Sequence, residues 1–111
     1  MERRKFPRHD VKDVPLKAIL ILNGGSLLKA DSPSAIEITT QAIDLSRGGI
    51  SVALQFDAQW EILSTTRSMD LVIEKDGIQF PTRGHVVRRQ ARQNLLGLEF
   101  ESPLRELTAF L

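Results

Sequence analysis

Two arginines near the N-terminus are well suited to bind an anionic ligand. Arg4 and Arg8 lie four residues apart, and Pro7 keeps the segment between them from forming a helix, because the residue before a proline is pushed toward extended conformations. The guanidinium group is a planar, permanently charged fork that binds phosphate through two parallel hydrogen bonds and pairs with the O6/N7 edge of guanine. This segment therefore predicts one half of a site for a ligand with phosphate and a guanine-like edge.

A polar turn in the middle of the chain carries groups that complement the arginines, and it reads Asp44-Leu45-Ser46-Arg47-Gly48-Gly49. Asp44 only accepts hydrogen bonds, so its carboxylate suits the N1–H and amino donors of guanine and repels phosphate. Ser46 can donate and accept. Gly48 and Gly49 allow positive φ angles and a close approach of the ligand to the backbone. We therefore expect the arginine segment and this turn to meet in space and form one site.

The two halves together resemble the paired signature of PilZ domains, bacterial receptors for cyclic di-GMP, which here reads Arg4-x-x-x-Arg8 and Asp44-x-Ser46-x-x-Gly49. The resemblance extends over nearly the whole chain. It implies a mainly β fold, a six-stranded antiparallel β-barrel with a C-terminal α-helix. It also implies that residues 1–13 form a flexible arm that folds over the ligand, while residues 14–111 form the barrel. One departure is the long gap between the two halves, which we place in a loop between the first strands.

The resemblance implies ligand-binding residues in both halves: Arg3, Arg4, Arg8, Asp44, Ser46, Arg47, Gly48 and Gly49. Arg4 and Arg8 would bind phosphate and guanine edges, and Asp44 and Ser46 would read a guanine. The glycines would shape the turn. The purely structural alternative is that the turn is a tight connection between two strands, in which Asp44 and Ser46 only form hydrogen bonds with the backbone.

Arg3 precedes the R-x-x-x-R motif directly, and with Arg47 it is a secondary candidate for a stacking or phosphate contact. In PilZ domains an arginine at this place is associated with a stacked pair of cyclic di-GMP molecules. A guanidinium can stack on an exposed guanine face and also pair with a phosphate, whereas an apolar side chain can do neither. Arg3 therefore implies two ligand molecules per chain, and the alternative is one more solvated charge near the terminus.

Composition limits the classes of protein to consider. The 111 residues are enough for one domain, and cysteine is absent, which excludes disulfides and thiolate metal sites. The two histidines show no metal-ligand spacing, so no cofactor is expected. No apolar run is long enough to cross a membrane, and we infer a cytoplasmic protein. The net charge of +1 argues against a general binder of polyanions.

Six stretches with period-two alternation or many β-branched residues are predicted to be strands: 14–22, 36–43, 50–56, 69–74, 78–89 and 95–101. Lys75-Asp76-Gly77 is typical of a hairpin turn. The irregular stretch 57–68 holds the only tryptophan, Trp60, and is interpreted as a lid on the core. Ser102-Pro103 is typical of a helix start, and the leucines at 104, 107 and 111 would share one face of that helix.

Our main interpretation is a non-catalytic receptor that couples cyclic di-GMP to an unidentified bacterial partner protein through a conformational change. One alternative is a small barrel that binds single-stranded nucleic acid, although aromatic residues are only 5% of the chain and tyrosine is absent. Another is an interaction module of the same fold that binds no nucleotide. An enzyme has the least support, because no nucleophile elbow or P-loop is present. A homodimer stays open as an alternative to a monomer.

Overall fold

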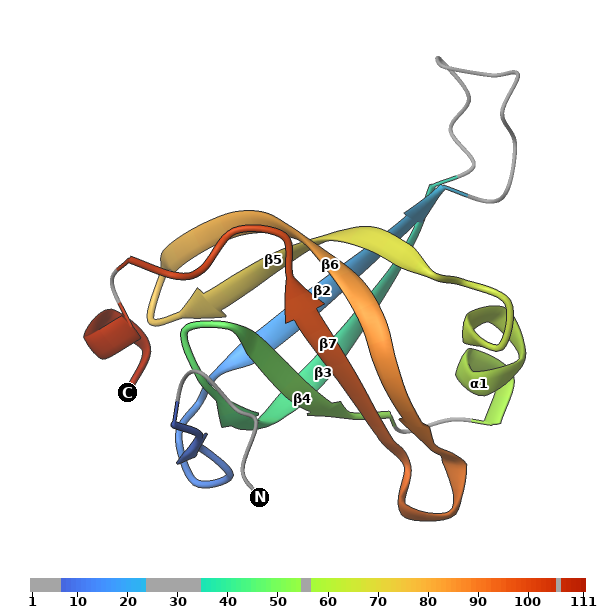
Figure 1. Ribbon diagram of the computed structural model, residues 1–111, viewed down its shortest axis with the longest axis horizontal. Helices are drawn as coiled ribbons and strands as arrows, with labels where there is room; N and C mark the ends of the chain where they lie inside the picture. Colours follow the sequence, from blue (N-terminus) through green and yellow to red (C-terminus); the bar gives the residue numbers. More distant parts are fainter. Residues whose placement is uncertain (1–6, 24–34, 55–56, 106) are drawn as a thin grey trace.

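The computed structural model describes residues 7–23, 35–54, 57–105 and 107–111, which form an antiparallel β-barrel (Figure 1). The barrel strands are β2 (Lys17–Asn23), β3 (Ala35–Leu45), β4 (Gly49–Ala53), β5 (Ser68–Lys75), β6 (Ile78–Gln90) and β7 (Leu95–Phe100). Their hydrogen-bonded order is β3-β2-β5-β6-β7-β4, and pairing of β4 with β3 closes the ring. The predicted six-stranded antiparallel barrel is confirmed. The expected loop between the first strands, at 24–34, lies outside the described residues.

Alternation of buried and more exposed residues along the strands explains why these segments form a closed barrel. Along β2, Ala18, Leu20 and Leu22 are buried, whereas the residues between them are less so. β5 and β7 repeat this pattern with Met69, Leu71 and Ile73 and with Leu96, Leu98 and Phe100. Because successive side chains of a strand point to opposite faces, one face of every strand fills the interior.

The β5–β6 hairpin turns at the predicted residues. Asp76 and Gly77 both have positive φ angles, 52° and 84°. Two consecutive positive φ angles define the two-residue turn that matches the twist of antiparallel strands, and aspartate followed by glycine is a favoured pair there. The sequence prediction of this turn is confirmed.

The stretch predicted to be irregular instead contains a short helix, α1 (Asp57–Leu63). Leu63 is fully buried, and Trp60 packs against the core and donates from Nε1 to Oδ1 of Asn94 at 3.3 Å. α1 lies on the side of the barrel away from the C-terminal segment (Figure 1). This helix could not be predicted from the sequence, because seven residues provide too little periodicity to identify a helix.

The predicted C-terminal α-helix is wrong. After β7, the residues that the structure describes (101–105 and 107–111) form only a single 3-10 turn, η2 (Leu107–Phe110). Leu104, Leu107 and Phe110 are buried, whereas Leu111 is exposed. Apolar residues spaced by three match the three residues per turn of a 3-10 helix rather than the α-helical spacing. Leu104 is buried against the barrel in a segment without regular secondary structure, and its amide is bonded to the Arg47 carbonyl oxygen. This contact prevents a helix from starting at Pro103.

Candidate ligand-binding site

A β-bulge near the end of β3 turns Asp44 out of the core. β3 pairs with β4 through Ala42↔Val52 and then Asp44↔Ser51, so Ile43 is an extra residue without a partner on β4. Ile38, Thr40 and Ala42 are buried before the bulge, and Leu45 is buried after it. Without the extra residue Asp44 would point inward, because the side-chain period of a strand is two.

A two-residue strand, β1 (His9–Asp10), brings the N-terminal segment to the same place. It pairs with the end of β3 through His9↔Leu45 and Asp10↔Asp44, and the Val11 amide donates to the Ile43 carbonyl oxygen at 2.9 Å. Val11 is 1% exposed and belongs to the core. The core therefore begins before residue 14, the expected start of the barrel.

These two features bring Arg8 and Asp44 together. The Arg8 Nη1 donates to Oδ1 and Oδ2 of Asp44 at 3.2 and 3.3 Å, and to Oγ of Ser51 at 3.0 Å. The Arg8 and Asp44 side chains are 27% and 26% exposed, so the pair lies at the surface with solvent on one side. The expectation that the two halves meet is confirmed for Arg8 and Asp44.

The turn after Asp44 is organised by Ser46. Its Oγ accepts hydrogen bonds from the amides of Gly48 and Gly49, each at 3.1 Å, and its own amide donates to the Gly49 carbonyl oxygen at 2.9 Å. Ser46 is 7% exposed. The serine therefore has the structural role that a tight connection between strands requires, and its contact with a ligand stays a prediction.

Gly49 is required by a close approach of backbone rather than by its φ angle. A Cβ atom at Gly49 would lie 2.4 Å from the Leu98 carbonyl oxygen on β7. Neither Gly48 nor Gly49 has a φ in the left-handed region, so the turn does not use the positive φ angles that glycine allows. The absence of a side chain lets the turn sit directly against β7.

Arg47 points from the turn to the C-terminal segment. Its Nη1 donates to the carbonyl oxygens of Leu104 and Arg105 at 3.2 and 3.3 Å. The Leu104 amide donates to the Arg47 carbonyl oxygen at 2.7 Å, and the Phe100 amide donates to that of Gly48 at 2.8 Å. The turn is therefore bonded to the end of β7 and to the segment after it.

The structure thus brings together five predicted residues and adds one. Arg8, Asp44, Ser46, Gly48 and Gly49 lie in one neighbourhood, while Arg47 lies in the same turn with its guanidinium on the C-terminal segment. Arg3 and Arg4 lie outside the described residues. Ser51 was not predicted, because its position opposite Asp44 depends on the bulge. The sequence does carry a sign of that bulge: the buried apolar residues Ala42 and Leu45 are three positions apart, whereas an unbroken strand would bury every second residue.

The described part of the chain lacks two other kinds of feature, a cluster of metal ligands and a membrane-spanning helix. Its histidine, aspartate and glutamate side chains form no group of three or more that could hold a metal ion. Within the same residues, none of the helices has the length and apolar character needed to span a bilayer.

The fold is a closed antiparallel β-barrel, and the Arg8 guanidinium lies beside the Asp44 carboxylate at the turn between β3 and β4. The sequence matches the PilZ domain family over residues 2–110, so the chain belongs to the PilZ family. PilZ domains are in general receptor modules for cyclic di-GMP rather than enzymes. The resemblance expected from the sequence is therefore confirmed.

A solved structure shows the same fold. The Bacillus subtilis inhibitor of motility (MotI/DgrA) superimposes with a TM-score of 0.55 at 22% sequence identity, over 100% of this chain and 49% of that protein. This chain therefore spans about half the length of MotI. No curated protein matches the sequence significantly.

Proposed function

We propose that this chain is a receptor for cyclic di-GMP and that the ligand binds over the turn between β3 and β4. The observation that carries the proposal is the contact of Arg8 with Asp44, which joins the two halves of the family signature across 36 positions of sequence. A cation and an anion side by side at the surface suit a ligand with both phosphate oxygens and guanine donors.

Arg8 can bind the ligand without leaving Asp44. All three of its side-chain hydrogen bonds to described residues start from Nη1, so within the described part of the chain Nε and Nη2 are not used and could form a bidentate contact with a ligand. The Asp44 carboxylate has further lone pairs beyond those that Arg8 uses. A partly exposed ion pair contributes only about 0–1 kcal/mol, so rearranging it for a ligand costs little.

The roles of Arg3 and Arg4 are proposed from the family motif. Arg4 would complete the phosphate contacts, and Arg3 would stack on or pair with a second cyclic di-GMP molecule. Residues 1–13 would act as an arm that the ligand orders. Amide hydrogen exchange should then slow at Arg3–Arg8 when cyclic di-GMP is added, and unchanged exchange there would contradict this part of the proposal.

The output would be a conformational change passed to a partner protein in the cytoplasm of a bacterial cell. The hydrogen bonds of Arg47 to Leu104 and Arg105 support this route, because they join the ligand turn to the C-terminal segment. If a ligand phosphate bound the Arg47 guanidinium, the hydrogen bonds of Arg47 to this segment would weaken and the segment could move. The protein would act as an adaptor and carry out no chemical reaction.

Calorimetric titration of the whole chain with cyclic di-GMP tests the proposal. GMP and a single-stranded oligonucleotide serve as controls for a lone nucleotide and for a general polyanion. We expect saturable binding of cyclic di-GMP only. Binding of the oligonucleotide with no response to cyclic di-GMP would favour the nucleic-acid alternative, and no response to any ligand would favour an interaction module.

A further inference from the structure

Two hollows lie beside the loop that joins α1 to β5, far from the ligand turn. The first has a volume of about 530 Å³ and lies between α1, β2, β3 and β5; the second, of about 640 Å³, lies against β6. Thr65 and Arg67 line both. Ile36, which lines the first, is eight residues before Asp44 on β3, a separation of about 25 Å along the strand.

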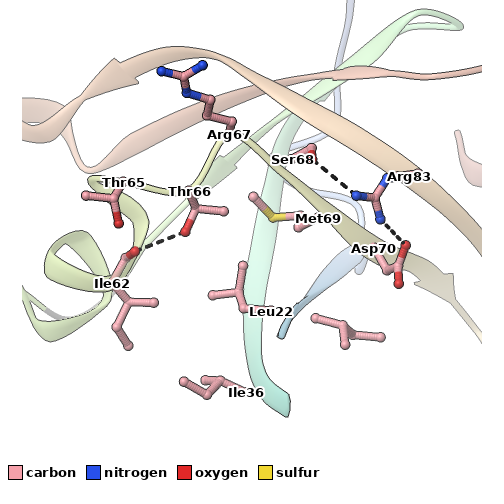
Figure 2. A pocket seen from close by; sticks show the side chains of 11 residues that line it. Leu22, Ile36, Ile62, Thr65, Thr66, Arg67, Ser68, Met69, Asp70 and Arg83 are labelled. Atoms are coloured by element: carbon pink, nitrogen blue, oxygen red, sulfur yellow. Dashed lines mark hydrogen bonds and ion pairs between the residues drawn. The ribbon is translucent and has the colours of Figure 1, made fainter. Parts of the chain in front are cut away.

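The first hollow is apolar at its base and open to solvent. Ile36 and Ile62 are 37% and 38% exposed, and they are two of only five large apolar side chains that are exposed in the described part of the chain. Figure 2 shows them with Leu22 and Met69, facing the same space from β2, β3, β5 and α1. The volume is in the range that accepts a side chain or small ligand group.

The second hollow is basic. Arg67, His85 and Arg89 line it, and no carboxylate does so among the described residues. Arg89 donates from Nε to the Leu63 carbonyl oxygen at 3.2 Å and from Nη2 to that of Thr66 at 2.6 Å. Both acceptors are neutral, and among the described residues no carboxylate pairs with Arg89. His85 has a carboxylate at 4.0 Å, that of Glu101.

Arg67 lies between the two hollows and lines both of them. Its guanidinium forms no hydrogen bond or ion pair with a described residue, and in Figure 2 it points away from the apolar side chains. The nearby Arg83, by contrast, is paired with Asp70 at 2.9 Å and bonded to Ser68. Asp70 is the one carboxylate lining the first hollow in the described residues, and Arg83 neutralises it.

We propose that these two hollows bind one segment of a partner protein, in which a large aliphatic side chain lies close to a carboxylate. The aliphatic group would cover Ile36 and Ile62, and the carboxylate would pair with Arg67 beside Arg89. Charge complementarity selects this occupant, because the exposed apolar area adjoins two guanidinium groups that have no carboxylate partner among the described residues. An arginine that adjoins an apolar pocket is a frequent centre of binding energy in protein interfaces. The inference does not depend on cyclic di-GMP binding.

The probe is a library of random 12-residue peptides displayed on phage and selected on the immobilised whole chain. We expect the enriched peptides to share a large aliphatic residue within three positions of an acidic one. The best peptide should lose at least tenfold in affinity when its acidic residue is changed to the amide. It should also lose at least tenfold toward Arg67→Ala and toward Ile62→Ser.

Arg92→Ala and Val87→Ser are matched controls, because both residues are exposed and neither lines these hollows. We expect their affinities to stay within twofold of the unsubstituted protein, and circular dichroism verifies that all four variants are folded. Three outcomes would overturn the proposal: no enrichment over a blank surface, enriched peptides without an acidic residue, or equal losses in the control variants. Binding of a single-stranded oligonucleotide that depends on Arg67 would overturn it too.

Discussion

Arg47 and Leu104 are joined by hydrogen bonds in both directions across 57 positions of sequence. The Arg47 Nη1 donates to the Leu104 carbonyl oxygen at 3.2 Å, and the Leu104 amide donates to the Arg47 carbonyl oxygen at 2.7 Å. Leu104 is fully buried, and Leu107 and Phe110 pack on the same core. The position of the C-terminal segment therefore depends on a residue of the turn between β3 and β4.

Arg47→Ala should loosen the C-terminal segment and leave the barrel folded. The substitution removes the side-chain bonds to two carbonyl groups and keeps the backbone bond of Leu104. We therefore expect the free energy of local opening to fall by about 1 kcal/mol, which raises the open population, and with it the exchange rate, roughly fivefold. Amide hydrogen exchange at Leu104 and Leu107 measures it. Arg92→Ala, an exposed arginine without a described partner, is the control. Equal exchange in both variants would show that the Arg47 side chain does not hold the segment.

Gly49→Ala should damage both stability and ligand binding. The added Cβ would meet the Leu98 carbonyl oxygen, and the shift needed to relieve such overpacking costs about 1–3 kcal/mol and moves the turn. Gly77→Ala is the matched control: its φ of 84° costs about 1–2 kcal/mol, but a Cβ there meets nothing within 4 Å. We expect thermal unfolding to show losses in both variants and calorimetry to show weaker cyclic di-GMP binding in Gly49→Ala alone. Normal affinity in that variant would contradict the account of the turn.

Val11→Ala should release the strand that places Arg8. Val11 is 1% exposed, and removing two buried carbon atoms costs about 2 kcal/mol with the resulting cavity. Lys12→Ala, one residue along and exposed, should change the free energy of unfolding by less than about 0.5 kcal/mol. Denaturant unfolding of both variants measures the difference. If Val11→Ala proved as stable as Lys12→Ala, the role of Val11 as an anchor of β1 would be wrong.

Arg3→Leu should change the number of ligands bound. We expect two cyclic di-GMP molecules per unsubstituted chain and a value closer to one in the variant, with some binding preserved, because leucine offers no donor for a phosphate. Titration at a known concentration of active protein gives both values. A stoichiometry of one that is the same in both proteins would remove this role from Arg3.

Much of the barrel could be predicted from the sequence, because an apolar residue recurs at every second position of β2, β5 and β7. The Asp76–Gly77 turn was predictable from two residues, since few pairs tolerate two positive φ angles. The Arg8–Asp44 contact was predicted from complementary chemistry and the family signature. Each of these features depends on residues that are close in sequence or on a recognised pattern.

The features that were missed depend on long-range pairing. The bulge at Ile43 decides that Asp44 faces outward and that Ser51 lies beside it, and a bulge follows from the register of two strands rather than from local propensity. The C-terminal helix was predicted from a plausible start at Ser102-Pro103. Bonds from Leu104 to the turn override that local preference.

Calorimetric titration of cyclic di-GMP into the unsubstituted chain and into Arg8→Ala tests the central claim most directly. Charge-assisted contacts contribute roughly 1.5–3 kcal/mol each, so we expect affinity to fall by about one to two decades in Arg8→Ala, with the fold unchanged by circular dichroism. Arg92→Ala should bind as the unsubstituted chain does. Equal affinities in all three proteins, or no binding to any of them, would contradict a cyclic di-GMP site built on Arg8 and Asp44.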